Sequence, residues 1–141
     1  MTELSSLLYK LKTTDQKVTQ LFENKLSISL TRYEILQRLL ELAPCSQVAL
    51  QESLQIDQAA ITRHLKILEE EGYISRHRNP QNQRQLIVNL RGKALHDLQD
   101  QPSEQHLSVK QQMQDIFTAK ESETLSNLLD KLINGLENIT F

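Results

Sequence analysis

Residues 57–90, DQAAITRHLKILEEEGYISRHRNPQNQRQLIVNL, are the most informative part of the sequence because they join a helical pattern to two strand-like runs. Apolar residues recur in its first half at spacings of three and four, which predicts an amphipathic helix. Asp57 is a good N-cap for that helix, and Gly72 can end it in a left-handed conformation. The turn-rich segment NPQNQ then lies between YISRHR and RQLIVNL, which predicts a β-hairpin.

Helices are also predicted on the N-terminal side of this stretch. An amphipathic helix is expected over residues 3 to about 26. Thr31 with Glu34 forms a capping-box pattern, which predicts the start of a second helix. Pro44 ends that helix, and Ser46 is a suitable N-cap for a short third one.

The C-terminal part of the chain is predicted to be helical as well. A long helical pattern begins at about Arg91, and Pro102 marks a kink or a break near residue 101. Thr118 with Glu121 forms a second capping box, which starts the last helix. The predicted fold is therefore mainly α with a small β-hairpin, in the order α-α-α-α-β-β-α-α.

Length and composition are those of a small helical protein. The chain has 141 residues, 38% hydrophobic and 24% charged, with three glycines and three prolines. These values are typical of one soluble domain, or of one domain with helical extensions. The single cysteine, Cys45, excludes an intramolecular disulfide and favours a reducing compartment. No apolar run approaches the roughly 20 residues that span a membrane, so we expect a cytoplasmic protein with no membrane partner.

The sequence carries no pattern of a catalytic or metal site. It has no glycine-rich phosphate loop and no G-x-S-x-G motif, so we expect neither enzyme activity nor a cofactor. The histidines at positions 64, 77, 96 and 106 lack a paired spacing on one helix and have no cysteine partner. We therefore expect no metal site.

Charge is distributed unevenly along the chain, although the net charge is only −2. Between residues 72 and 93 there are five positive side chains and no acid, whereas residues 95–141 carry eight acids and three lysines. A basic patch on an acidic protein produces a directional electrostatic field. The asymmetry favours an anionic partner for the segment that holds the hairpin.

Two short helices followed by a hairpin make a winged helix-turn-helix, whose second helix enters the major groove of DNA. At about 100° per residue, the outward face of that helix is small, hydroxylic or basic, which suits contact with base edges. Its alanines and the Thr62 methyl can meet thymine methyl groups, and Arg63 can bond guanine bidentately. The predicted DNA contacts of the helix are Ala59, Ala60, Thr62, Arg63 and Lys66. Those of the hairpin, to phosphate or the minor groove, are Arg76, Arg78 and Arg84.

An outward face with arginine and lysine is by itself typical of a solvated helix. The hairpin beside it and the absence of acids from residues 72–93 favour DNA binding over that simpler interpretation.

The chain resembles the MarR-type transcriptional regulators. The resemblance rests on LTRYEILQRL before the helix-turn-helix, on ITRHLKILEEEGYISR across the second helix and first hairpin strand, and on the hairpin, or wing. The family's wing pattern is Asp-x-Arg-x-x-x-Val-x-Leu-Thr-x-x-Gly. Arg84, Val88 and Leu90 match it, whereas the Asp, Thr and Gly are replaced by Asn82, Arg91 and Ala94. Asn82 can hydrogen-bond the wing arginine but cannot form an ion pair with it.

The resemblance implies an obligate homodimer, in which the first helix and the last two helices intertwine. It divides the chain into a dimerisation helix at 1–28, a winged helix-turn-helix at 29–91 and dimerisation helices at 92–141. The apolar stripes assigned to the interface are Leu4, Leu7, Leu8, Leu11, Leu125, Leu128, Leu129, Leu132 and Leu136. Packing of these stripes within one chain is the alternative.

The resemblance also implies a small-molecule effector that binds between the dimerisation helices and the winged domain and weakens DNA binding. Tyr33 is the predicted pocket residue, with a core tyrosine as the alternative. Cys45 lies away from the position at which some relatives sense oxidants. The expected function is a ligand-responsive repressor that binds a pseudo-palindromic operator. A winged protein–protein interaction module without DNA binding is the rival reading.

Overall fold

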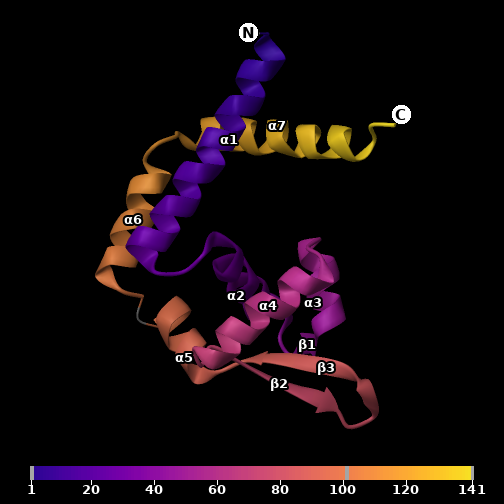
Figure 1. Cartoon of the computed structure of the whole chain (residues 1–141). Helices are drawn as coiled ribbons and strands as arrows, with labels where there is room; N and C mark the ends of the chain where they lie inside the picture. The colour runs from indigo at the N-terminus through magenta and orange to yellow at the C-terminus, as the bar shows by residue number, and fades with distance from the viewer. Residues whose placement is uncertain (1, 101, 141) are drawn as a thin grey trace. The chain divides into compact units, whose positions relative to one another are not determined.

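The computed structural model describes residues 2–100 and 102–140, which form two compact units, one up to Ser103 and one from Glu104 onward (Figure 1). The elements of the first unit are α1 (Glu3–Leu21), the π-helical turn η1 (Phe22–Leu26), α2 (Leu30–Leu42), β1 (Cys45–Ser46), α3 (Gln47–Leu54), α4 (Gln58–Glu70), β2 (Ile74–Asn79), β3 (Asn82–Leu90), α5 (Gly92–Leu95) and the π-helical turn η2 (His96–Asp100). Those of the second unit are α6 (Glu104–Gln114) and α7 (Ala119–Glu137). The mainly helical fold and the hairpin are thereby confirmed.

Side-chain N-caps start helices α3, α4 and α7 at the predicted residues. Asp57 accepts a hydrogen bond from the Ala60 N–H at 2.8 Å and starts α4, as predicted. Ser46 caps α3 in the same way. Thr118 and Glu121 form the predicted capping box of α7.

The predicted N-cap of α2, Thr31, is wrong, because the N-cap is Ser29. Ser29, in extended backbone geometry, accepts a hydrogen bond from the Arg32 N–H at 3.1 Å, and the helix begins at Leu30. Thr31 is therefore already inside the first turn, and its spacing to Glu34 does not make a capping box. A serine two residues earlier meets the same requirement for an acceptor at the free N–H groups.

Backbone conformation ends the helices where the sequence predicts a stop. Ala43, before Pro44, has a ψ of 143° and ends α2. Gly72 has a φ of 84°, which ends α4 and lets the Tyr73 N–H reach the Leu68 carbonyl at 3.0 Å. The predicted break at Pro102 falls between η2 and α6, although Gln101 itself lies outside the described residues. The helical pattern after Arg91 is thus divided into α5 with η2, and α6.

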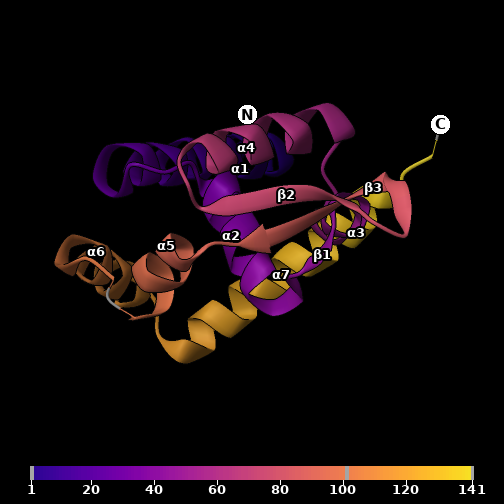
Figure 2. The same ribbon diagram turned by 90° about the horizontal axis from the view of Figure 1, so that it is seen from below.

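The hairpin strands and β1 form a three-stranded antiparallel sheet in the order β1-β3-β2 (Figure 2). The predicted strands pair with Ile74 opposite Leu90 and Arg76 opposite Val88. Their turn consists of Pro80 and Gln81, which is shorter than the predicted five-residue segment. The sequence does not reveal β1, because this strand has two residues and exists only through its pairing with β3.

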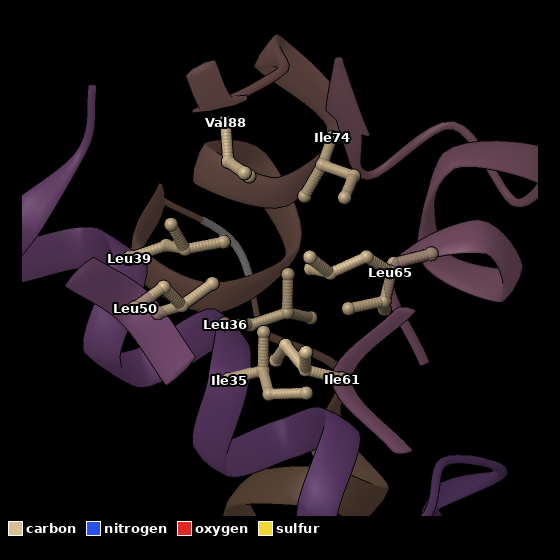
Figure 3. Packing of buried hydrophobic residues seen from close by; sticks show 9 residues of the cluster. Ile35, Leu36, Leu39, Leu50, Ile61, Leu65, Ile74 and Val88 are labelled. Carbon is tan, nitrogen blue, oxygen red and sulfur yellow. The ribbon is translucent and has the colours of Figure 1, made fainter. Parts of the chain in front are cut away.

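The hydrophobic core holds the helix-turn-helix against the sheet (Figure 3). It is made by fully buried side chains from α2, α3, α4, β2 and β3, namely Ile35, Leu36, Leu39, Leu50, Ile61, Leu65, Leu68, Ile74 and Val88. Burial of each such side chain contributes roughly 1.5–3 kcal/mol. This packing holds α4 and the hairpin in a defined mutual arrangement.

Candidate nucleic-acid interface

Helix α4 presents two chemically different faces. Ile61, Leu65 and Leu68 are fully buried, so the opposite face is turned to solvent. That exposed face forms an open, mostly apolar depression lined by Gln58, Ala59, Thr62, Arg63 and Lys66. Four of the five predicted helix contacts thus come together in one place, while Ala60 is half-buried at its flank. Small side chains with two cations at the edge leave room for base edges and attract phosphate.

The wing carries two arginines into solvent. Arg78 and Arg84 are both exposed, and Arg78 donates one hydrogen bond, at 3.4 Å, to the Gln83 carbonyl across the hairpin. The hydrogen-bonding capacity that remains on these guanidinium groups is available for phosphate. Both residues therefore lie exposed on the hairpin, which belongs to the same packed unit as α4, and their contact with DNA stays a prediction.

Asparagine side chains shape the tip of the wing. Asn82 Oδ1 accepts the backbone N–H of Arg84 at 3.3 Å, so the contact expected with the arginine side chain is made with its backbone instead. Asn79 Oδ1 accepts the N–H of Gln81 at 3.0 Å, and Asn79 Nδ2 donates to Gln85 Oε1 at 2.7 Å. Hydrogen bonds of these asparagine side chains hold the turn, where the family's wing has an Asp that can pair with the arginine.

Arg76 does not lie with the other wing arginines, and its packing disfavours the predicted contact with DNA. Its side chain is 16% exposed. Its Nη2 and Nε donate to Glu69 Oε1 and Oε2 at 3.2 and 3.4 Å, and its Nη1 donates to Gln47 Oε1 at 3.3 Å. The guanidinium group is thereby committed to α4 and α3 and ties the base of β2 to both helices.

Gln47 also lies at the candidate interface, although no sequence motif points to it. As the first residue of α3, it accepts from Arg76 and donates from Nε2 to Thr62 Oγ1 at 3.3 Å. It therefore lies directly beside the exposed face of α4. A polar residue just after an N-cap serine is a weak sequence signal, and only the packing of α3 against α4 brings it to Thr62.

Two cations lie beside the acidic C-terminal end of α4. Glu69 pairs with Arg76 at 3.2 Å. Lys93 Nζ donates to the Glu71 carbonyl at 2.8 Å and lies 4.5 Å from the centre of the Tyr73 ring. A lysine at a helix C-terminus offsets the unfavourable effect of acids on the helix dipole.

His64 faces α2 from the half-buried side of α4. Its Nδ1 lies 3.4 Å from Arg32 Nη1. Burial lowers the pKa of His64, and the charges of Arg32 and Arg63 lower it further. The imidazole is consequently neutral near pH 7 and can accept from Arg32, which joins α4 to α2.

Two residues considered for sensing lie in packed surroundings. Tyr33 is half-buried, and its ring centre lies 5.5 Å from that of Phe22 at a tilt of 59°. Cys45 is half-buried in β1, and burial raises the pKa of its thiol. Its reactive thiolate form is therefore less populated than in a free cysteine.

Apolar side chains are exposed along both terminal helices. On α1, Leu4, Leu7 and Leu8 are 63%, 49% and 45% exposed, and Leu11 is half-buried. On α7, Leu125, Leu128 and Leu136 are exposed, and Leu129 and Leu132 are half-buried. α7 fully buries none of its described residues. Such stripes mark surfaces that associate with another apolar surface.

Residues 2–100 and 102–140 contain neither a membrane-spanning helix nor a metal-binding cluster. No helix there is long and apolar enough to cross a membrane. Within the same ranges, no group of three or more histidine, cysteine, aspartate and glutamate side chains could hold a metal ion.

Known proteins resemble this chain in sequence and in fold. The model of the MarR family matches residues 28–86. The uncharacterized HTH-type transcriptional regulator YdgJ of Bacillus subtilis (strain 168) is 32% identical over 137 residues, which cover 97% of this chain and 83% of YdgJ. A probable transcriptional regulator from Pseudomonas aeruginosa has 27% identity and a TM-score of 0.77, with 89% of this chain and 96% of that chain covered. A mutant MarR from E. coli, complexed with operator DNA, has 25% identity and a TM-score of 0.68, with 92% of each chain covered.

Proposed function

We propose that this chain, which belongs to the MarR family of transcriptional regulators, is a dimeric repressor that binds a pseudo-palindromic DNA operator. The observation that carries the proposal is the exposed face of α4, where small side chains and two cations surround one open depression. The family is one of regulators and not of enzymes, so the chain is assigned no catalytic role. Membership also favours a DNA-binding protein over a winged interaction module without DNA.

The residues of the interface divide into readers of bases and holders of phosphate. Arg63, exposed beside Ala59 and Thr62, would bond a guanine edge, and Lys66, one turn further along α4, would meet phosphate. Arg78 and Arg84 would hold the DNA backbone or the minor groove beside the helix. The E. coli MarR mutant bound to operator DNA supports this placement through its similar fold.

The dimer would form through residues 1–28 and 92–141, which leaves residues 29–91 free to bind DNA. The exposed leucines of α1 and α7 support this division, since a lone chain would leave a large apolar surface in water. A two-fold axis would set the two copies of α4 about one DNA turn apart, roughly 34–36 Å. We place the dimer in the cytoplasm, in keeping with DNA as its partner.

An effector would act by changing the separation of the two α4 helices. Tyr33 remains the proposed pocket residue, because it lies near the start of α2 and packs on Phe22, the first residue of η1, directly after α1. A ligand that displaced the Tyr33–Phe22 contact would change the orientation of α2 relative to α1, and with it the orientation of the winged region. Quenching of tyrosine fluorescence by phenolic and anionic compounds, compared between wild type and Tyr33→Phe, tests this assignment.

Fluorescence anisotropy with DNA from upstream of the chain's own gene tests the function. We expect binding that weakens steeply as salt rises, because bound cations are released from phosphate. Arg84→Ala should weaken binding to all sequences and reduce the salt slope by about one, whereas Arg63→Ala should relax preference at one base position. Binding without salt dependence, together with no effect of Arg84→Ala, would exclude the proposal.

Sedimentation tests the dimer separately. Leu128 is 59% exposed, so Leu128→Glu should leave the winged core intact and produce a monomer. A wild-type chain that sediments as a stable monomer would rule out the dimer while leaving the DNA assay unaffected.

A further inference from the structure

A chain of hydrogen bonds runs from the base of the wing to the exposed face of α4. It begins at Glu69, passes through Arg76 and Gln47, and ends at Thr62, whose hydroxyl donates to the Gln58 carbonyl at 2.8 Å. These residues come from α3, α4 and β2, which are packed on one core. The direction of every hydrogen bond in this series can be worked out from Arg76.

Arginine has donors only, so Arg76 determines the orientation of the groups around it. Gln47 must turn its Oε1 toward the Arg76 guanidinium, and this leaves its Nε2 facing Thr62. Because Nε2 is a donor, Thr62 Oγ1 must accept. The single hydroxyl hydrogen of Thr62 then goes to the Gln58 carbonyl, which lies within hydrogen-bond distance.

This arrangement decides how Thr62 can meet DNA. In helices threonine divides between two χ1 rotamers according to its bond with a preceding carbonyl, so the bonds of Oγ1 to Gln58 and Gln47 hold one rotamer. The hydroxyl hydrogen is already used, and the group left to project from the exposed side chain is the methyl. Ala59, one turn earlier, adds a second methyl to the same open depression.

We propose that Thr62 reads DNA through its methyl group, as an apolar contact with the 5-methyl of a thymine, and that Gln47 and Arg76 are positioning residues that hold it in this state. The proposal rests on the proposed DNA-binding function and specifies one base contact within it. Thr62 is thus a specificity-determining residue whose hydroxyl serves the protein and whose methyl serves recognition.

The test uses the full-length chain and a duplex selected by it from a random-sequence pool. Each thymine of the selected site is replaced in turn by deoxyuridine, which removes the 5-methyl group and changes nothing else on the base. At one position or its symmetry mate, wild type should lose about four-fold in affinity, the factor expected for one buried methyl. Thr62→Ser, which keeps the hydroxyl and loses the methyl, should show no loss at that position.

Two further variants separate the methyl from the hydroxyl and test the positioning residue. Thr62→Val keeps the methyl and should retain the deoxyuridine penalty. Gln47→Met removes the amide, so Thr62 should become free to rotate and the penalty should shrink, while the salt slope stays unchanged because no charge is lost. Gln51→Met, the same substitution one turn along α3, serves as the control and should behave as wild type.

The possible outcomes test the Thr62 methyl contact separately from the proposed DNA-binding function. If wild type and Thr62→Ser respond equally to deoxyuridine at every position, or if Thr62→Val loses the penalty, the methyl contact is refuted and DNA binding stands. An unchanged penalty in Gln47→Met would refute the positioning role. Failure of wild type to select any duplex would overturn both the inference and the proposed function.

Discussion

Replacement of Arg76 by alanine should destabilise the fold and leave the phosphate contacts of the protein intact. Replacement of its neighbour Arg78 should do the opposite. Arg76 is 16% exposed and makes three N–H···O bonds, two of them to the Glu69 carboxylate. Arg78 is exposed and makes one bond to a backbone carbonyl. The two arginines are two residues apart on one strand, which makes them a matched pair.

The size of the effect follows from the geometry around Arg76. A hydrogen bond to a charged group contributes about 1.5–3 kcal/mol. The bonds of Arg76 to Glu69, at 3.2 and 3.4 Å, are longer than the charge-assisted optimum of about 2.7–2.9 Å, so the lower end applies. Glu69 is 40% exposed, so water can replace its lost partner. With the packing of the Arg76 stem added, we expect a loss of about 2 kcal/mol per chain.

Urea unfolding at a fixed protein concentration measures this loss. With an m-value of about 1.5 kcal/mol per M, the midpoint for Arg76→Ala should fall by about 1.3 M. Arg78→Ala should keep the wild-type midpoint and show weaker, less salt-dependent DNA binding. If Arg76→Ala unfolds with wild type and instead matches Arg78→Ala in DNA binding, the assignment of Arg76 to the fold is refuted.

Three other predictions test the core, the α2–α4 contact and the thiol. Leu36→Ala should cost about 3 kcal/mol in urea unfolding, because Leu36 is fully buried and a cavity would remain; a cost below about 1 kcal/mol would contradict the core assignment. The pKa of His64 in the folded chain is lowered from 6.5 by burial and, to a smaller extent, by the charges of Arg32 and Arg63. As the pH falls below 6.5, the unfolded chain therefore takes up a proton at His64 before the folded chain does. The stability that neutral His64 contributes is lost as the pH falls through the folded pKa. The urea midpoint should therefore drop more for wild type than for His64→Gln between about pH 7.5 and 5.5, and equal drops would argue against the contact. Cys45, whose pKa is raised by burial, should react with a disulfide reagent about tenfold more slowly in the folded chain than in urea, and equal rates would show an accessible thiol.

Local chemistry accounts for the features that the sequence predicts well. The caps at Asp57 and Ser46, the left-handed Gly72 and the capping box at Thr118 each depend on a few neighbouring residues. The buried and exposed faces of α4 follow from its 3.6-residue period alone. The same local rule failed at α2, where the cap is Ser29, two residues before the predicted Thr31.

The features that the sequence missed depend on contacts between distant segments. Strand β1 exists because Cys45 meets Val88, across a separation that no local pattern records. Arg76 reads as one more basic wing residue until Glu69 and Gln47 are brought to it. Strand alternation puts Arg76 and Arg78 on the same face as the fully buried Ile74, so it does not by itself tell which of the two arginines meets the helices.

The helical periodicity, the hairpin and the concentration of positive charge between residues 72 and 93 can all be predicted from the sequence. Which of those charged side chains face solvent depends on how the distant segments pack. Burial of the apolar faces of α4 and β2 in one core brings Arg76 against a carboxylate and leaves Arg78 and Arg84 exposed. A guanidinium group bonds whichever acceptor packing brings within reach, and that choice is made by side chains far from it in the sequence.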